Sequence, residues 1–194
     1  NDFSMACLEQ AIGNVAAIKP QAAFFEQQGP AGMQILQNLG RAAIDAGLLV
    51  IMDAKRGDIG STSTAYAAGW IGHDAPFPSD ALTVNPWLGI DTLAPFLDRA
   101  DATGSGLFIL NRTSNPGACD LQDQMVDGQP LYQHLAALLA PLHSRRPSPP
   151  ESCPSGRGAA TIAISGRTLD LRSQCRMNEC IGKALLSGRT LAGA

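Results

Sequence analysis

Short apolar runs alternate with longer amphipathic segments from residue 15 onward, and this alternation predicts the main elements of the fold. Four runs that each end in a polar or charged residue are predicted strands, at residues 15–19, 48–53, 81–85 and 107–111. Apolar residues at helical spacing, with Asp91 as a candidate N-cap, predict helices at residues 32–46, 61–71, 91–99 and 130–139. Strands that alternate with helices in this way are typical of βα units around a parallel sheet.

The predicted strands end at residues 19, 53, 85 and 111, which are 34, 32 and 26 residues apart. Both a (β/α)8 barrel and a doubly wound open sheet would show this spacing. The residues at these ends favour the barrel, because barrel enzymes keep their reactive groups at the C-terminal ends of the strands. The plainer alternative is that polar residues only mark where the chain leaves a buried strand. The four strand-end residues are Lys19, Asp53, Asn85 and Asn111.

The pattern breaks after residue 142, where a stretch rich in Pro and Arg at residues 145–150 has the composition of a linker. Residues 1–144 contain 6 Lys and Arg against 14 Asp and Glu, whereas residues 145–194 contain 8 against 3 and none of the ten aromatic residues. Only residues 159–164 of this second part resemble a strand. We therefore predict a partial barrel domain over residues 1–144 and an atypical basic tail over residues 145–194, either disordered or out of frame.

The composition excludes several classes of protein. With 45% hydrophobic and 16% charged residues and a net charge of −3, the chain has the balance of an ordinary globular domain. No apolar stretch approaches the ~20 residues of a membrane span, and no basic-then-apolar leader opens the sequence, so no membrane association is expected. Five irregularly spaced cysteines without a Cys-x-x-Cys pair favour a reducing cytoplasm. The dispersed arginines of the tail lack aromatic stacking partners, so no nucleic-acid partner is expected.

Two of the three lysines in the chain, Lys19 and Lys55, lie at or just beyond predicted strand ends. Lys55 stands between Asp53 and Asp58 in a segment that leads into the Gly-Ser-Thr start of a helix. Alternating carboxylates and ammonium groups can stay charged out of bulk water, and such an array can place a cation where negative charge develops. The alternative is a solvated loop whose surface ion pairs contribute little.

Segments around these residues resemble, in order, the orotidine 5′-phosphate decarboxylase family in its longer bacterial branch. The resemblance covers roughly residues 10 to 140, and the Asp-x-Lys-x-x-Asp block with its flanks is highly specific. The segments that carry it are residues 19–26, 53–62, 65–67, 83–89 and 112–118.

The resemblance implies a (β/α)8 barrel, a homodimer without cofactor or metal, and conversion of the small molecule orotidine 5′-monophosphate (OMP) to UMP and carbon dioxide in pyrimidine biosynthesis. Lys55 would lie by C6 of the pyrimidine, stabilise the developing carbanion and donate the proton. Asp53 would lie near the departing carboxylate, either destabilising it or holding Lys55 in place, two roles that the sequence leaves open. Lys19 and Asp58 would hold the charge network and the ribose.

Three further residues match substrate-binding positions of the family. Ile59 and Thr62 match residues that contact substrate from the partner subunit, and Asp58 and Thr62 are expected to reach the partner's site. Ser114 matches the serine after the fifth strand of the family that recognises the pyrimidine.

The chain also departs from the family pattern. Complete barrels have ~250 residues, only strands two to five are recognisable in this chain of 194 residues, and an incomplete barrel is expected. The first-strand aspartate, strands six to eight, and the Gln and Arg that hold the phosphate have no recognisable counterparts, and the context of Arg167 does not suit that arginine.

Two alternatives follow from these departures. One is a catalytically inactive remnant that lacks the grip on the phosphate. The other is a related group of magnesium-dependent phosphosugar aldolases and decarboxylases, which shares Asp-x-Lys-x-x-Asp. The segments at residues 19–21 and 113–116 argue against that group.

Overall fold

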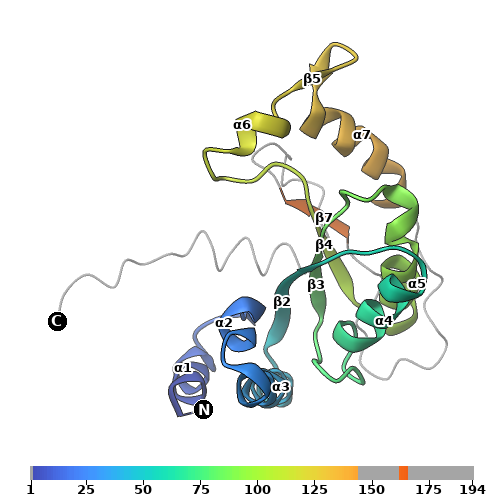
Figure 1. Cartoon of the computed structure of the whole chain (residues 1–194). Coiled ribbons are helices and arrows are strands. Elements are labelled where there is room, and N and C mark those ends of the chain that lie inside the picture. The colour runs from blue at the N-terminus through green and yellow to red at the C-terminus, as the bar shows by residue number, and fades with distance from the viewer. Residues whose placement is uncertain (1, 144–161, 166–194) are drawn as a thin grey trace.

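The structure is a computed structural model that describes residues 2–143 and 162–165 (Figure 1). Its main sheet contains five parallel strands with helices between them. A separate small sheet consists of one antiparallel pair of short strands. The strands of the sheet are β1 Ala17–Ile18, β2 Leu49–Arg56, β3 Ala81–Val84, β4 Gly106–Leu110 and β7 Ile162–Ser165, and the pair is β5 Met125–Val126 with β6 Gln129–Pro130. The helices are α1 Asp2–Ala11, α2 Ala22–Glu26, α3 Gly29–Asp45, α4 Gly60–Trp70, the 3₁₀ helix η1 Ile90–Leu93, α5 Ala94–Thr103, α6 Ala118–Leu121 and α7 Leu131–His143.

The order of the strands distinguishes the two architectures that the sequence left open. Each strand pairs in parallel with the strand before it, in the order β1-β2-β3-β4-β7. A doubly wound sheet reverses direction at a switch point, whereas a barrel adds each strand to the same edge. The described strands therefore form an open section of a (β/α)8 barrel, as predicted.

Alternation along the strands separates a helix-packed face from a face that carries polar groups. Val50, Met52, Leu82 and Val84 are fully buried and belong to the hydrophobic core cluster. Because neighbouring side chains of a strand point to opposite faces, Asp53 and the other intervening residues of β2 and β3 face the other way. In a closed barrel that other face lines the interior, where polar groups at the strand ends can meet.

The helices cover the first of these faces. α3 contributes Leu36, Leu39 and Ala43 to the core, and this spacing of three and four residues forms a single apolar stripe. α5 contributes Phe96, Leu97 and Ala100 in the same way. Figure 1 shows α4 and α5 side by side beside the sheet, and α6, β5 and α7 grouped beyond the end of β4.

Three predicted elements differ from those observed. The strand predicted at residues 15–19 is only two residues long, and the strand predicted to end at Asp53 continues to Arg56, so Asp53 and Lys55 lie within β2. The helix predicted at residues 91–99 begins as η1 and continues as α5 to Thr103. Asp91 is not its N-cap, because Gly89 precedes η1 and Asp91 lies inside it.

The strand β7 comes from the segment predicted to be a tail. It overlaps the strand expected at residues 159–164 and pairs with β4 from Leu107↔Ile162 to Leu110↔Ser165. It lies beside β4, in the position of the next strand of a barrel. The remainder of residues 145–194, including Arg167, lies outside the described residues, and the domain boundary at 144 stays a prediction.

Within residues 2–143 and 162–165, no helix combines the length and apolar character that crossing a membrane requires.

Replacing Phe96 by Ala should destabilise the fold strongly. Phe96 is fully buried in the core cluster, so truncation removes its contacts with the sheet and leaves a cavity. Such truncations cost about 3–5 kcal/mol of unfolding free energy. Urea denaturation would measure the loss. Phe3 is 82% exposed, so Phe3→Ala is a matched control with a change below about 0.5 kcal/mol, and equal losses in both variants would refute this packing.

Candidate active site

Asp53 lies between two lysine ammonium groups. Its Oδ2 accepts a hydrogen bond from Lys19 Nζ at 2.5 Å, and its Oδ1 accepts one from Lys55 Nζ. The Asp53 side chain is 11% exposed, whereas those of Lys19 and Lys55 are 56% and 44% exposed. The structure thus brings together three of the four residues expected in the Lys/Asp/Lys/Asp array, with both cations accessible from outside.

Pairing of neighbouring strands places Lys19 beside Asp53. β1 pairs with β2 through Ala17↔Leu49, and beyond its end Asp53 N donates to Pro20 O at 3.0 Å. The side-chain amide of Gln21, oriented with its nitrogen toward Asp53, donates to Asp53 Oδ2 at 2.9 Å and to the Asp53 carbonyl at 3.0 Å. Asp53 is therefore held from the β1 side by its backbone and its side chain.

Lys55 has an unusual backbone conformation. Its φ is +49°, in the left-handed region that residues other than glycine rarely adopt. The register of β2 against β3 shifts between Met52 and Arg56, which marks a β-bulge. Bulges re-aim side chains, and both bulges and strained backbones cluster at functional sites.

Thr83 of β3 is hydrogen-bonded to both Asp53 and Lys55 of β2. It is a site residue that the sequence analysis missed. Its hydroxyl accepts a hydrogen bond from Lys55 N at 2.8 Å and donates one to Asp53 Oδ1 at 3.1 Å. One hydroxyl thus fixes both the bulged backbone and the carboxylate. The signal was present, because Thr83 is the one polar residue of β3.

Arg56, at the end of β2, packs between two helices. Its guanidinium forms an ion pair with Glu26 of α2 and lies 5.5 Å from the ring centroid of Tyr66 and 4.7 Å from that of Trp70, both in α4. Its carbonyl accepts a hydrogen bond from Asn85 N at 2.8 Å. These contacts hold the end of the bulged strand, so Lys55 projects from an anchored segment.

The lysines also determine the charge of Asp53. Burial raises the pKa of its carboxyl, but the hydrogen bonds and positive charges of Lys19 and Lys55 outweigh burial, and the pKa of Asp53 lies below its usual 3.8. Asp53 is therefore ionised at neutral pH, and the cluster holds one negative charge between two ammonium groups.

This shift predicts a loss of stability in acid. A carboxyl whose pKa is lower in the folded chain stabilises the fold above pH 3.8, and this contribution disappears as the pH falls through the folded pKa. Wild type should therefore lose more unfolding free energy than Asp53→Asn between about pH 5 and pH 3. Urea denaturation at each pH would measure the difference, and parallel losses in both proteins would contradict it.

The structure does not bring Asp58 into this cluster. Its Oδ1 accepts a hydrogen bond from the Ile59 backbone N–H at 2.8 Å, and in the described part of the chain it has no hydrogen bond or ion pair with Lys19, Asp53 or Lys55. Ile59 is 62% exposed, and Thr62 is also exposed at the start of α4. Ile59 and Thr62 are therefore accessible from outside, while Asp58 is half-buried and bonded to the backbone beside it.

The remaining candidate residues lie after β3 and β4. Ser114 is exposed, and within residues 2–143 and 162–165 no hydrogen bond links it to the cluster. Asn85 and Asn111 line a mainly apolar cavity of about 270 Å³, into which neither lysine projects. The buried Asn111 Oδ1 has no hydrogen-bond partner. The other lining residues are Pro86, Trp87, Leu110, Thr113, Leu121, Gln122, Leu131, Tyr132, His134, Leu135 and Leu138.

The chemistry available to the cluster follows from its groups. Two accessible ammonium groups beside a fixed carboxylate can stabilise negative charge that develops on a ligand, and Lys55 can donate a proton. Across the described part of the chain, no three His, Cys, Asp or Glu side chains form a group suited to hold a metal ion.

Comparisons with known proteins agree on one family. The family model described as orotidine 5′-phosphate decarboxylase / HUMPS family matches residues 3–141. The chain is 49% identical over 148 residues to orotidine 5′-phosphate decarboxylase of Rhodopirellula baltica and 46% identical over 145 residues to that of Corynebacterium glutamicum. These alignments cover 74% and 72% of this chain and 49% and 52% of the relatives, so the chain spans about half their length.

Solved structures show the same relationship. A Streptomyces avermitilis protein assigned as an orotidine 5′-phosphate decarboxylase is 38% identical, with a TM-score of 0.72 over 91% of this chain and 60% of that chain. The Leishmania donovani OMP decarboxylase is 32% identical, with a TM-score of 0.63 over 83% of this chain and 60% of that chain.

Proposed function

The chain belongs to the orotidine 5′-phosphate decarboxylase / HUMPS family, and from this premise we propose that it converts OMP to UMP and carbon dioxide in pyrimidine biosynthesis. The observation that supports this most directly is the contact of Asp53 with both Lys19 and Lys55. That contact joins three residues at the positions that match the family's catalytic lysines and aspartate.

The proposed reaction breaks the bond between C6 of the pyrimidine and its carboxyl carbon. Carbon dioxide leaves, the electron pair stays on C6, and Lys55 Nζ donates a proton to that carbon. The ammonium of Lys55 also stabilises the carbanion before the proton moves, which is where a fixed charge lowers the barrier. The neutral amine of Lys55 then takes up a proton from water.

Asp53 and Lys19 support this step. Of the two roles considered for Asp53, its hydrogen bond to Lys55 Nζ favours the one in which it holds the proton donor in place. Lys19 neutralises part of the carboxylate charge from the other side and lies exposed beside the cluster, where it can contact the ribose.

A homodimer would bring the remaining residues to the reaction. Among the described residues Asp58 has no hydrogen bond or ion pair with its own chain's cluster, and Thr62 is exposed at the start of α4, which supports a role for both in the site of a second copy. Exposed apolar side chains lie on the segments that follow β1, β2 and β3, at the same edge of the sheet. They are Phe24, Ile59, Trp87 and Leu88, from 52% to 68% exposed, and burying them would favour dimerisation.

Release of labelled carbon dioxide from carboxyl-labelled OMP tests the proposal. We expect release with a metal chelator present, and a specific activity that falls on dilution as dimers separate. Activity that the chelator abolishes would indicate the magnesium-dependent group instead. A folded protein that releases none would be the inactive remnant of the family.

A further inference from the structure

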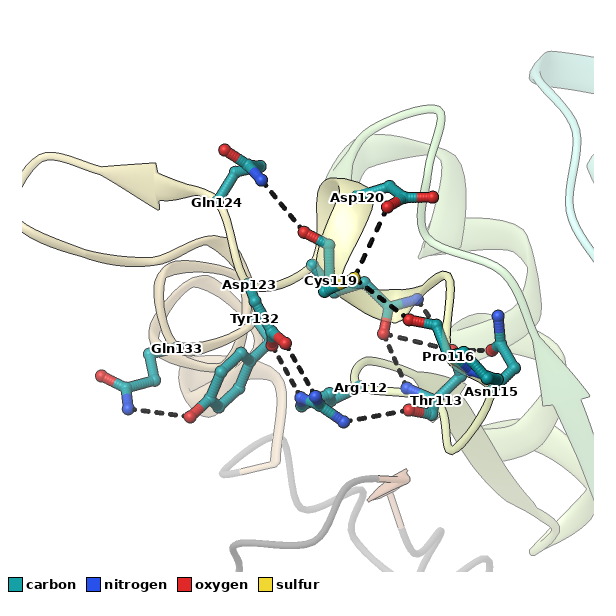
Figure 2. Close-up of polar contacts among 11 residues, drawn as sticks. Arg112, Thr113, Asn115, Pro116, Cys119, Asp120, Asp123, Gln124, Tyr132 and Gln133 are labelled. Atoms are coloured by element: carbon teal, nitrogen blue, oxygen red, sulfur yellow. Dashed lines mark hydrogen bonds and ion pairs between the residues drawn. The ribbon is translucent and has the colours of Figure 1, made fainter.

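The segment between β4 and α7, which contains Ser114, is closed on itself by an ion pair. Arg112 Nε and Nη2 each donate a hydrogen bond to one carboxylate oxygen of Asp123, both at 2.7 Å, and Nη1 donates to Thr113 O at 3.1 Å (Figure 2). The guanidinium also lies 5.9 Å from the ring centroid of Tyr132, at the start of α7. Two parallel hydrogen bonds specify the geometry of such a pair more closely than a single contact would.

A second set of contacts ties the same two chain segments together. The Gln122 side-chain amide accepts a hydrogen bond from Thr113 N at 2.7 Å and donates one to Thr113 Oγ1 at 3.0 Å. The Thr113 hydroxyl donates to Asn115 Oδ1 at 2.7 Å, and Asn115 O accepts from Ala118 N at 3.1 Å. Residues on both sides of Ser114 are therefore fixed.

Ser114 itself lies exposed in this closed segment, between Thr113 and Asn115. Its hydroxyl makes no hydrogen bond to any of the described residues, so its capacity to donate and accept is unused in the free chain. The segment therefore holds a serine hydroxyl in a fixed place where a ligand could reach it.

We propose that Arg112 and Asp123 are positioning residues, which form a clamp that holds Ser114 ready to hydrogen-bond the pyrimidine of OMP. The inference rests on the proposed function, because Ser114 meets a pyrimidine only if OMP is the ligand. The clamp acts by preorganisation: a segment that is ordered before binding loses less conformational entropy when the ligand arrives. Its contribution therefore appears in affinity, not in the chemical step.

Arg112→Lys tests the clamp, because lysine keeps the charge but cannot form the paired hydrogen bonds. We expect KM for OMP to rise about tenfold, with kcat unchanged within about twofold. Arg41 is an exposed arginine of α3, so Arg41→Lys is the matched control and should leave both constants unchanged. Asp123→Asn should reproduce the effect of Arg112→Lys.

A double-mutant cycle with Ser114→Ala separates positioning from a general structural role. If the clamp acts through Ser114, Arg112→Lys should change the dissociation constant of OMP about tenfold in wild type and less than about twofold in Ser114→Ala. An equal change in both backgrounds, or none in wild type, would overturn the proposal.

Amide hydrogen exchange distinguishes failure of this proposal from failure of the proposed function. Residues 112–118 should exchange at least about tenfold faster in Arg112→Lys than in wild type or Arg41→Lys. If wild type binds no OMP, the proposed function fails and exchange alone decides whether the clamp exists. Unchanged exchange in Arg112→Lys would refute the clamp whatever the protein binds.

Discussion

Lys55→Ala should reduce carbon dioxide release from OMP by at least about a thousandfold, since the variant loses both a preorganised positive charge and a proton donor. Neither of the two cations described beside Lys55 can readily replace it. Lys19 Nζ is bonded to the opposite oxygen of Asp53, and Arg56 is engaged with Glu26 and α4. The measurement is the rate of labelled carbon dioxide release at saturating OMP.

The loss of activity in Lys55→Ala should come from the reaction step, and the variant should remain folded. Lys55 is 44% exposed, so removal of the side chain opens no buried cavity, and the urea midpoint should change little. Arg41→Ala, an exposed cation of α3, is the control for removal of positive charge and should retain full activity. Turnover within tenfold of wild type in Lys55→Ala would exclude Lys55 as the proton donor.

Asp53→Asn should reduce turnover by at least about a hundredfold. The amide keeps the shape of the side chain but removes the negative charge that lies between two ammonium groups. Lys19 and Lys55 then repel each other, and Lys55 Nζ loses the partner that holds it by the pyrimidine. Steady-state rates of carbon dioxide release would measure the fall in kcat.

Asp45→Asn is the matched control, because Asp45 is an exposed carboxylate at the end of α3. It should retain wild-type turnover. Should Asp53→Asn also turn over OMP within threefold of wild type, the carboxylate would not be arranging Lys55, and the proposed role of the cluster would fail.

Much of the α/β fold could be predicted from periodicity. The buried strand β3 is a short, mainly apolar run, and the amphipathic helix α3 buries apolar residues at helical spacing, and both patterns are visible in the sequence. Two short helices were missed because they bury too little to leave a pattern. α2 has five residues and α6 has four, and each buries a single alanine.

The charged residues of the candidate site could be predicted from the sequence, but the hydrogen bonds that hold them in place could not. Lys19, Asp53 and Lys55 were found from their placement near strand ends, and the structure joins them. Thr83 was missed because its role depends on the register of β2 against β3. The sequence suggested a four-residue array, but the described residues do not bring Asp58 into the cluster.

The sequence by itself determined the alternation of strands and helices, the charged residues of the candidate site and the family. Each of these depends on the types of residues that lie close together along the chain. The tertiary structure decided the strand order, the bulge that turns Lys55, the pairing of Thr83 with Asp53 and the clamp between Arg112 and Asp123. The last two features join residues that are 30 and 11 positions apart, and the pairs of β1 with β2 and of β4 with β7 join residues that are further apart still. Such contacts form when burial and hydrogen bonding across the whole sheet select one register, and no local pattern records that choice.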